Sequence, residues 1–129
     1  MSVSVLIITH DQIGTALMET VRDMLGVSPM PVDVIPVLRT HNPDELVKEA
    51  EQITSRNDQT LVLTDMYGST PSNIACRLYT QENVRVVGGI NLPMLVRVLN
   101  YPRLNLDELV DKAISGGRDG VLTCKKDRN

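Results

Sequence analysis

Several residue types on which many functional sites depend are rare or missing in this chain of 129 residues. Tryptophan and phenylalanine are absent and there are three tyrosines, so there is little aromatic surface on which a flavin or nucleic-acid bases could stack. The two cysteines, Cys76 and Cys124, lie far apart without a CxxC spacing, which gives no support to a metal centre or a disulfide framework. We expect both thiols to be reduced and buried, and we expect neither a metal nor a cofactor.

Long apolar runs and an excess of positive charge are also missing. The longest apolar stretches, such as residues 5–8, are too short to cross a bilayer, and the first residues lack the basic region of a signal peptide. The formal net charge is -3, and no run of lysine and arginine is long enough to follow a phosphate backbone. We therefore expect a cytoplasmic protein without direct membrane insertion and without a nucleic-acid partner.

The composition that remains is that of an ordinary globular protein. Hydrophobic residues make up 42% of the chain and charged residues 22%, which argues against intrinsic disorder. A chain of this length fits one domain and buries a sizeable core. We expect a single domain over residues 1–129.

Hydrophobic periodicity predicts strands that alternate with helices along the whole chain. The predicted strands cover residues 3–9, 32–38, 60–64 and 84–89, with one more short strand at 121–124. The predicted helices cover residues 13–25, a segment that begins after the cap Asn42, residues 71–79 and 92–99, and a segment that begins at Asn105 and is closed by Gly116 and Gly117.

This alternation predicts an α/β fold with a doubly wound, mainly parallel sheet and helices on both faces. In the common strand order 2-1-3-4, a crevice opens at the carboxyl ends of the first and third strands. The residues just past these strands are 9–11, which contain His10, and 65–71, which begin with Asp65. Both segments are therefore expected to meet in the crevice.

A histidine that ends a buried strand beside a carboxylate is typical of a nucleophilic or acid-base imidazole. If Asp65 accepts a hydrogen bond from one ring N–H of His10, the tautomer is fixed and the other nitrogen can attack phosphorus. We expect Asp11 to act as a cap of the first helix rather than as a catalytic acid. His41, which precedes a helix cap at the same edge of the sheet, is expected on the surface without a catalytic role.

The loop that follows Asp65 has features of a phosphate site. Gly68 lets the backbone come close to a ligand, the hydroxyls of Ser69 and Thr70 can donate hydrogen bonds, and Pro71 presets the first turn of a helix. The N-terminus of a helix attracts anions. The same residues also suit a simple helix cap, and it is their pairing with His10 that favours a phosphoryl group.

Three blocks of sequence resemble the mannose-type enzyme IIA proteins of the bacterial phosphoenolpyruvate-dependent phosphotransferase system. They are IITHDQIGTAL at 7–17, LTDMYGSTPSNIA at 63–75 and GGINLPMLVRVL at 88–99. The resemblance implies that His10 accepts a phosphoryl group from the histidine-containing phosphocarrier protein and passes it to an enzyme IIB partner. It also implies that Asp65 holds the active histidine and that Asn91 supports the site.

The resemblance has one local departure and one structural consequence. The family usually has Trp-Gly-Gly-Ser-Pro where this chain has residues 67–71, so the second glycine is lost and Thr70 falls where a serine is usual. Family members look like homodimers that exchange a C-terminal strand, and residues 121–124 could provide it here. We expect no attached IIB domain within these 129 residues.

Three other functions fit parts of the pattern. The domain could be a regulatory module in which the phosphoryl group is a signal, and the site residues would then look the same. A receiver domain phosphorylated on Asp65 would need an acidic pair and Mg²⁺, but only Asp11 follows the first strand. A flavodoxin-like module would need a hydroxyl-rich loop after that strand, which is missing.

Overall fold

A computed structural model describes residues 2–125, and within them the sheet has four strands, all parallel to their neighbours. The strands lie in the order β2-β1-β3-β4, as predicted. Their bounds are β1 Val3–His10, β2 Val32–Val37, β3 Gln59–Thr64 and β4 Val84–Val87. The chain therefore has the doubly wound α/β fold.

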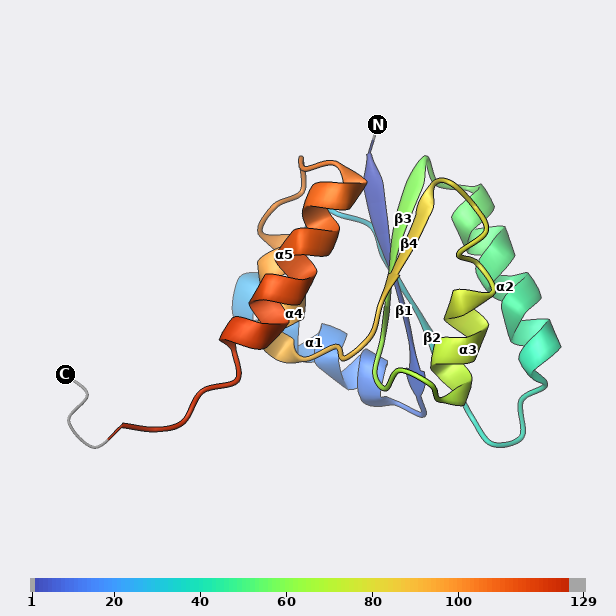
Figure 1. The fold of residues 1–129 in the computed structure, drawn as a ribbon, viewed down its shortest axis with the longest axis horizontal. Coiled ribbons are helices and arrows are strands. Elements are labelled where there is room, and N and C mark those ends of the chain that lie inside the picture. The colour runs from blue at the N-terminus through green and yellow to red at the C-terminus, as the bar shows by residue number, and fades with distance from the viewer. Residues whose placement is uncertain (1, 126–129) are drawn as a thin grey trace.

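Five helices of the described residues cover the two faces of the sheet. Figure 1 shows α1, α4 and α5 on one side of the strands and α2 and α3 on the other. Their bounds are α1 Ile13–Leu25, α2 Pro43–Ser55, α3 Thr70–Cys76, α4 Leu92–Leu99 and α5 Leu106–Asp119. Both faces are covered because each parallel crossover carries its helix to one side or the other.

The core divides into two layers because neighbouring residues of a strand point to opposite faces. On β1, Val5 and Ile7 pack in the layer under α1, α4 and α5, whereas Leu6 and Ile8 pack in the layer under α2 and α3. All four are buried. A strand that is apolar on both faces must lie in the interior of the sheet, which is where β1 is found.

The expected caps form at the starts of α2 and α5, and a glycine ends α1. Asn42 accepts a hydrogen bond from the Asp44 N–H at the start of α2, and Asn105 and Glu108 form a capping box at the start of α5. Gly26 follows the last residue of α1 with a φ of 80°, a conformation that glycine adopts without strain.

The prediction that Gly116 and Gly117 close the last helix is wrong, because α5 continues through both to Asp119. A Cβ atom at Gly116 would lie 2.8 Å from Cβ of Arg97, and one at Gly117 would lie 2.9 Å from Cε of Met94. The two glycines therefore allow α5 to pack closely against α4.

The expected short strand at 121–124 is not formed by this chain. Val121 and Leu122 are 75% and 81% exposed, and residues 121–125 extend away from the end of α5 (Figure 1). A strand needs a neighbour with which to exchange backbone hydrogen bonds, and this segment has none among residues 2–125.

Both cysteines are exposed, so the prediction of buried thiols is wrong. Cys76 is the last residue of the short helix α3, and Cys124 lies in the extended segment after α5. Neither position reaches the core. Among the described residues, no helix is long and apolar enough to cross a membrane.

Candidate functional site

His10 and Asp65 meet at the carboxyl ends of two neighbouring strands, as predicted. His10 is the last residue of β1, and Asp65 comes directly after β3, which pairs with β1 in parallel register. Nδ1 of His10 lies 2.8 Å from Oδ2 of Asp65. The sheet thus places the two side chains together although 55 positions separate them.

Asp65 accepts three hydrogen bonds in this position. Its Oδ2 accepts from the backbone N–H of His10 at 2.9 Å as well as from the ring, and its Oδ1 accepts from the N–H of Met66 at 3.0 Å. Burial by itself raises the pKa of Asp65, but the hydrogen bonds from His10 and Met66 outweigh it, so the pKa lies below its ordinary value. Asp65 is therefore an ionised acceptor at neutral pH.

This contact decides which nitrogen of His10 is reactive. Because the carboxylate can only accept, the neutral ring carries its proton on Nδ1. Nε2 then keeps its lone pair, and the side chain of His10 is 45% exposed while that of Asp65 is only 13% exposed. The arrangement offers an oriented nucleophile to another molecule and keeps the orienting acid from solvent.

A cavity of about 350 Å³ lies beside His10. Thr70, the first residue of α3, lines it together with His10, so one of the predicted hydroxyl-bearing residues lies in the wall of this cavity.

Gly68 and Ser69 have other roles in the same loop. The N–H of Gly68, whose φ is 89°, donates to Oγ of Ser72 at 3.2 Å. The hydroxyl of Ser69 donates to the backbone oxygen of Met66, and the carbonyl of Ser69 accepts from the N–H of Asn73. These donors are thus engaged in shaping the loop, and Thr70 is the residue of the three that lines the cavity.

Asp11 does not cap α1, contrary to the prediction. The N-cap position is Gln12, whose side chain makes no capping hydrogen bond. Asp11 has a φ of 46° and its N–H donates to the carbonyl of Val37 at 2.9 Å. Aspartate is among the few residues that tolerate this left-handed conformation, so Asp11 forms the turn that leads from β1 to α1.

Two residues of the cavity beside His10 were not expected to belong to the site. Arg39 and His41 line it, and both come from the loop that joins β2 to α2. His41 is exposed as predicted, but it lies at the site rather than apart from it. The signal in the sequence was their position directly after a strand that neighbours β1.

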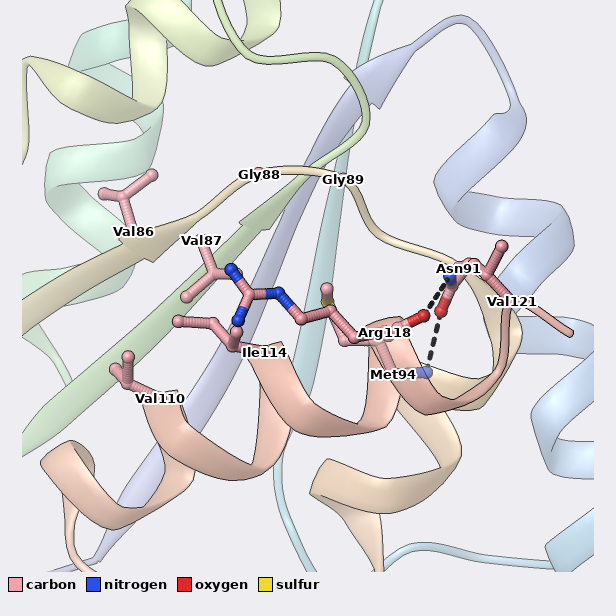
Figure 2. A pocket seen from close by; sticks show the side chains of 11 residues that line it. Val86, Val87, Gly88, Gly89, Asn91, Met94, Val110, Ile114, Arg118 and Val121 are labelled. Carbon is pink, nitrogen blue, oxygen red and sulfur yellow. Dashed lines mark hydrogen bonds between the residues drawn. The ribbon is translucent and has the colours of Figure 1, made fainter.

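Asn91 lies in a different place, at the start of α4. Its Oδ1 accepts from the N–H of Met94 at 2.9 Å, and its Nδ2 donates to the carbonyl of Gly117 at 3.2 Å (Figure 2). Asn91 therefore caps α4 and ties it to α5. Among residues 2–125, no three side chains of histidine, cysteine, aspartate or glutamate are grouped so that they could hold a metal ion.

Comparison with known proteins agrees with this architecture. Residues 4–114 match the EIIA-man family model, which is described as the fructose IIA component of the PTS system. The chain is 31% identical over 131 aligned positions to the mannose-specific EIIAB component of the PTS system of Escherichia coli K12. The alignment covers 97% of this chain, which spans 40% of the length of that relative.

Solved structures share the fold at lower sequence identity. The mannose/sorbose-specific IIA subunit of the phosphotransferase system from Enterococcus faecalis superposes with a TM-score of 0.88 at 23% identity, over 100% of this chain and 99% of that one. The phosphotransferase component EIIA of Streptococcus agalactiae gives 0.85 at 21% identity, over 94% and 96%.

Proposed function

The chain belongs to the EIIA-man family of phosphotransferase-system IIA components, and we propose that within this family it carries a phosphoryl group on Nε2 of His10. One observation supports this assignment above the others, which is the 2.8 Å contact between Nδ1 of His10 and Oδ2 of Asp65. It leaves Nε2 as the free nucleophile at an exposed edge of the sheet.

The transfer proceeds by exchange of one phosphorus-nitrogen bond for another. The lone pair of Nε2 attacks the phosphorus of a phosphohistidine on the donor, and the donor's phosphorus-nitrogen bond breaks with its electron pair left on the donor ring. The ring of His10 keeps its proton on Nδ1 and gains positive charge, which the ionised Asp65 stabilises at 2.8 Å. No proton has to move in this step.

The loop after β3 forms one side of the phosphoryl site in this proposal. The hydroxyl of Thr70 donates to a phosphoryl oxygen, while Gly68 and Ser69 hold the loop in shape through their own hydrogen bonds. Asn91 supports the site indirectly, because it fixes α4 against α5. The whole of 1–129 acts as a single IIA domain.

The partners that fit this chemistry are other proteins of the phosphotransferase system. The donor is the histidine-containing phosphocarrier protein and the acceptor is an enzyme IIB, and the exchange takes place in the cytoplasm. The curated relatives are EIIAB components, which is consistent with a IIB acceptor. A regulatory target of the phosphorylated domain is the alternative acceptor.

The test is phosphorylation with purified components. The chain is incubated with phosphoenolpyruvate, enzyme I and the phosphocarrier protein, and the product is followed by intact mass and peptide mapping. We expect an adduct on His10 that is lost in acid, retained in base and absent from His10→Gln. An adduct that is labile in base and maps to Asp65 would instead indicate receiver-like chemistry.

A second experiment separates a relay from a regulatory module. Phosphorylated chain, freed of the phosphocarrier protein, is mixed with candidate IIB proteins, and the phosphoryl group is followed by intact mass. Transfer to one of them supports the relay, whereas retention on His10 with every IIB supports the regulatory function.

We also propose that the chain forms a homodimer through the open edge of β4. A groove of about 510 Å³ runs between β4 and α5, and Figure 2 shows Val86, Val87, Val110 and Ile114 around it. An edge strand has free backbone groups that can pair with a strand of another molecule. The exposed residues 121–124 of a second copy are the proposed strand.

Light scattering coupled to size exclusion tests the dimer. We expect a dimer for the natural chain and a monomer for Leu122→Asp, because a carboxylate on the exchanged strand would have to enter the apolar groove. The matched control is Ile13→Asp, which alters an exposed apolar residue on α1. A monomeric natural chain at high concentration would contradict the proposal.

A further inference from the structure

We infer that Arg39 and His41 bind the phosphoryl group on His10 from the side opposite the loop after β3, an inference that rests on the function proposed above. The cavity of about 350 Å³ beside His10 has Thr70 from the start of α3 and both Arg39 and His41 from the β2–α2 loop in its wall. In Figure 1 this loop lies along the lower edge of the view, below the start of α3.

The β2–α2 loop reaches His10 because of the strand register. Val37, the last residue of β2, is the partner of His10 in the parallel ladder, and its carbonyl accepts the N–H of Asp11 at 2.9 Å. This hydrogen bond holds the carboxyl ends of β1 and β2 side by side. Side chains two and four positions beyond Val37 lie within reach of whatever His10 carries.

The ring of His41 is held in one orientation. The N–H of Leu38 donates to Nδ1 of His41 at 3.1 Å, and the N–H of His41 donates to the carbonyl of Leu38 at 3.1 Å, which closes the turn. Since Nδ1 is the acceptor, the neutral ring carries its proton on Nε2. His41 therefore lines the cavity with a hydrogen-bond donor as its remaining polar atom.

Arg39 adds a full positive charge to the same wall. Within residues 2–125, no hydrogen bond or ion pair engages its guanidinium, and the side chain is exposed. Of the two acids in the first turn of α2, Asp44 is paired with Arg77 at 2.8 Å, and neither Asp44 nor Glu45 forms an ion pair with Arg39 among the described residues. The guanidinium thus remains available to an incoming anion.

A phosphoryl group on His10 would place negative charge and hydrogen-bond acceptors beside these donors. It carries between one and two negative charges at neutral pH and has three strongly accepting oxygens. In the loop after β3, Thr70 is the predicted residue that lines the cavity. The hydroxyl of Ser69 already donates to the backbone oxygen of Met66. A planar guanidinium and an imidazole N–H supply the charge and the donors that the remaining oxygens need.

The experiment measures the equilibrium of phosphoryl exchange between the phosphocarrier protein and this chain. Mixtures of the phosphorylated carrier and the chain are brought to equilibrium and analysed by intact mass. Loss of one donor to a charged phosphoryl oxygen at an exposed site is expected to lower the equilibrium constant about 3- to 10-fold for Arg39→Gln and for His41→Asn. Arg39→Lys keeps the charge and should recover part of the loss.

The variants separate binding from structure. Asparagine at position 41 keeps an oxygen that can accept from the N–H of Leu38 and lacks the donor at Nε2. Arg56→Gln removes the same charge at the far end of α2 and is the matched control. Thermal unfolding of the unphosphorylated variants should stay close to that of the natural chain.

The outcomes distinguish this inference from the function on which it rests. If the natural chain accepts no phosphoryl group on His10, the proposed function fails and the inference fails with it. If His10 is phosphorylated but Arg39→Gln and His41→Asn match Arg56→Gln, the inference alone is overturned. An adduct that maps to His41 would also overturn it, since His41 would then be an acceptor.

Discussion

Replacing Asp65 with asparagine removes a charge while it leaves the size of the side chain nearly unchanged. In the natural chain, Oδ2 accepts from the backbone and the ring of His10, and Oδ1 accepts from the N–H of Met66. Three donors thus converge on one carboxylate. An amide has one accepting oxygen and one donating nitrogen, so neither of its two orientations satisfies all three donors.

Both orientations of the amide impair the site. If the oxygen faces His10, the amide N–H₂ group meets the N–H of Met66, and a donor is left without an acceptor. If the nitrogen faces His10, the backbone N–H of His10 loses its acceptor, and the ring is pushed towards the tautomer whose proton is on Nε2. That tautomer has no lone pair at the attacking atom.

The size of the effect follows from the contact that is lost. A hydrogen bond to a charged group contributes about 1.5 to 3 kcal/mol. If the contact of 2.8 Å is fully kept in the transition state, its loss slows phosphorylation of His10 by about 10- to 150-fold. The rate should fall even when the chain is saturated with donor, because the ring and not the docking of the partner is altered.

Quenched-flow measurement of phosphoryl transfer from the phosphocarrier protein provides the assay. Asp58→Asn removes the same charge at the exposed residue before β3, at the opposite end of the sheet, and should keep the natural rate. A rate for Asp65→Asn within about twofold of that control would refute the orientation of His10 by a carboxylate.

Three further predictions concern stability. Because the pKa of Asp65 is lowered in the folded chain, its ionised carboxylate stabilises the fold above its ordinary pKa of 3.8. This stabilisation is lost as the pH falls through the lower pKa of the folded state. In urea titrations, the difference in unfolding free energy between the natural chain and Asp65→Asn should therefore shrink as the pH is lowered into this range. Gly14→Ala should destabilise the chain by about 1 to 3 kcal/mol in urea unfolding, since its Cβ would lie 2.7 Å from Cγ2 of Ile7, whereas the exposed Thr20→Ala should change stability by no more than about 0.5 kcal/mol. Asn91→Ala should lower the unfolding free energy, measured by calorimetry, by about 1 to 2 kcal/mol, because the α4 cap and the hydrogen bond to Gly117 are lost. The transfer assay should show that His10 of this variant is still phosphorylated. Loss of phosphorylation in a folded variant would mean that Asn91 acts in the site itself.

The sequence by itself predicted the elements and their order because these depend on local patterns. Apolar runs that are buried on both faces marked the strands, and the caps at Asn42 and Asn105 marked two helix starts. Once strands and helices alternate, the parallel order and the shared carboxyl edge follow from the handedness of the crossovers. For that reason the pairing of His10 with Asp65 was predictable from the ends of two strands.

Packing between distant parts of the chain decided the rest. Gly116 and Gly117 resemble a helix end in the sequence, but they extend α5 because α4 lies close enough to exclude a side chain there. Whether residues 121–124 form a strand depends on a neighbour that the sequence does not specify.

The site shows the same division. Sequence spacing predicted that His10, Asp65 and Thr70 lie near one another, because their positions follow from the strand ends. It did not reveal that the turn after β2 brings Arg39 and His41 to the same cavity, or that the hydroxyl of Ser69 is engaged within its own loop. Local patterns determine which elements form, but the direction of a loop side chain depends on hydrogen bonds and packing that exist only once the sheet is assembled.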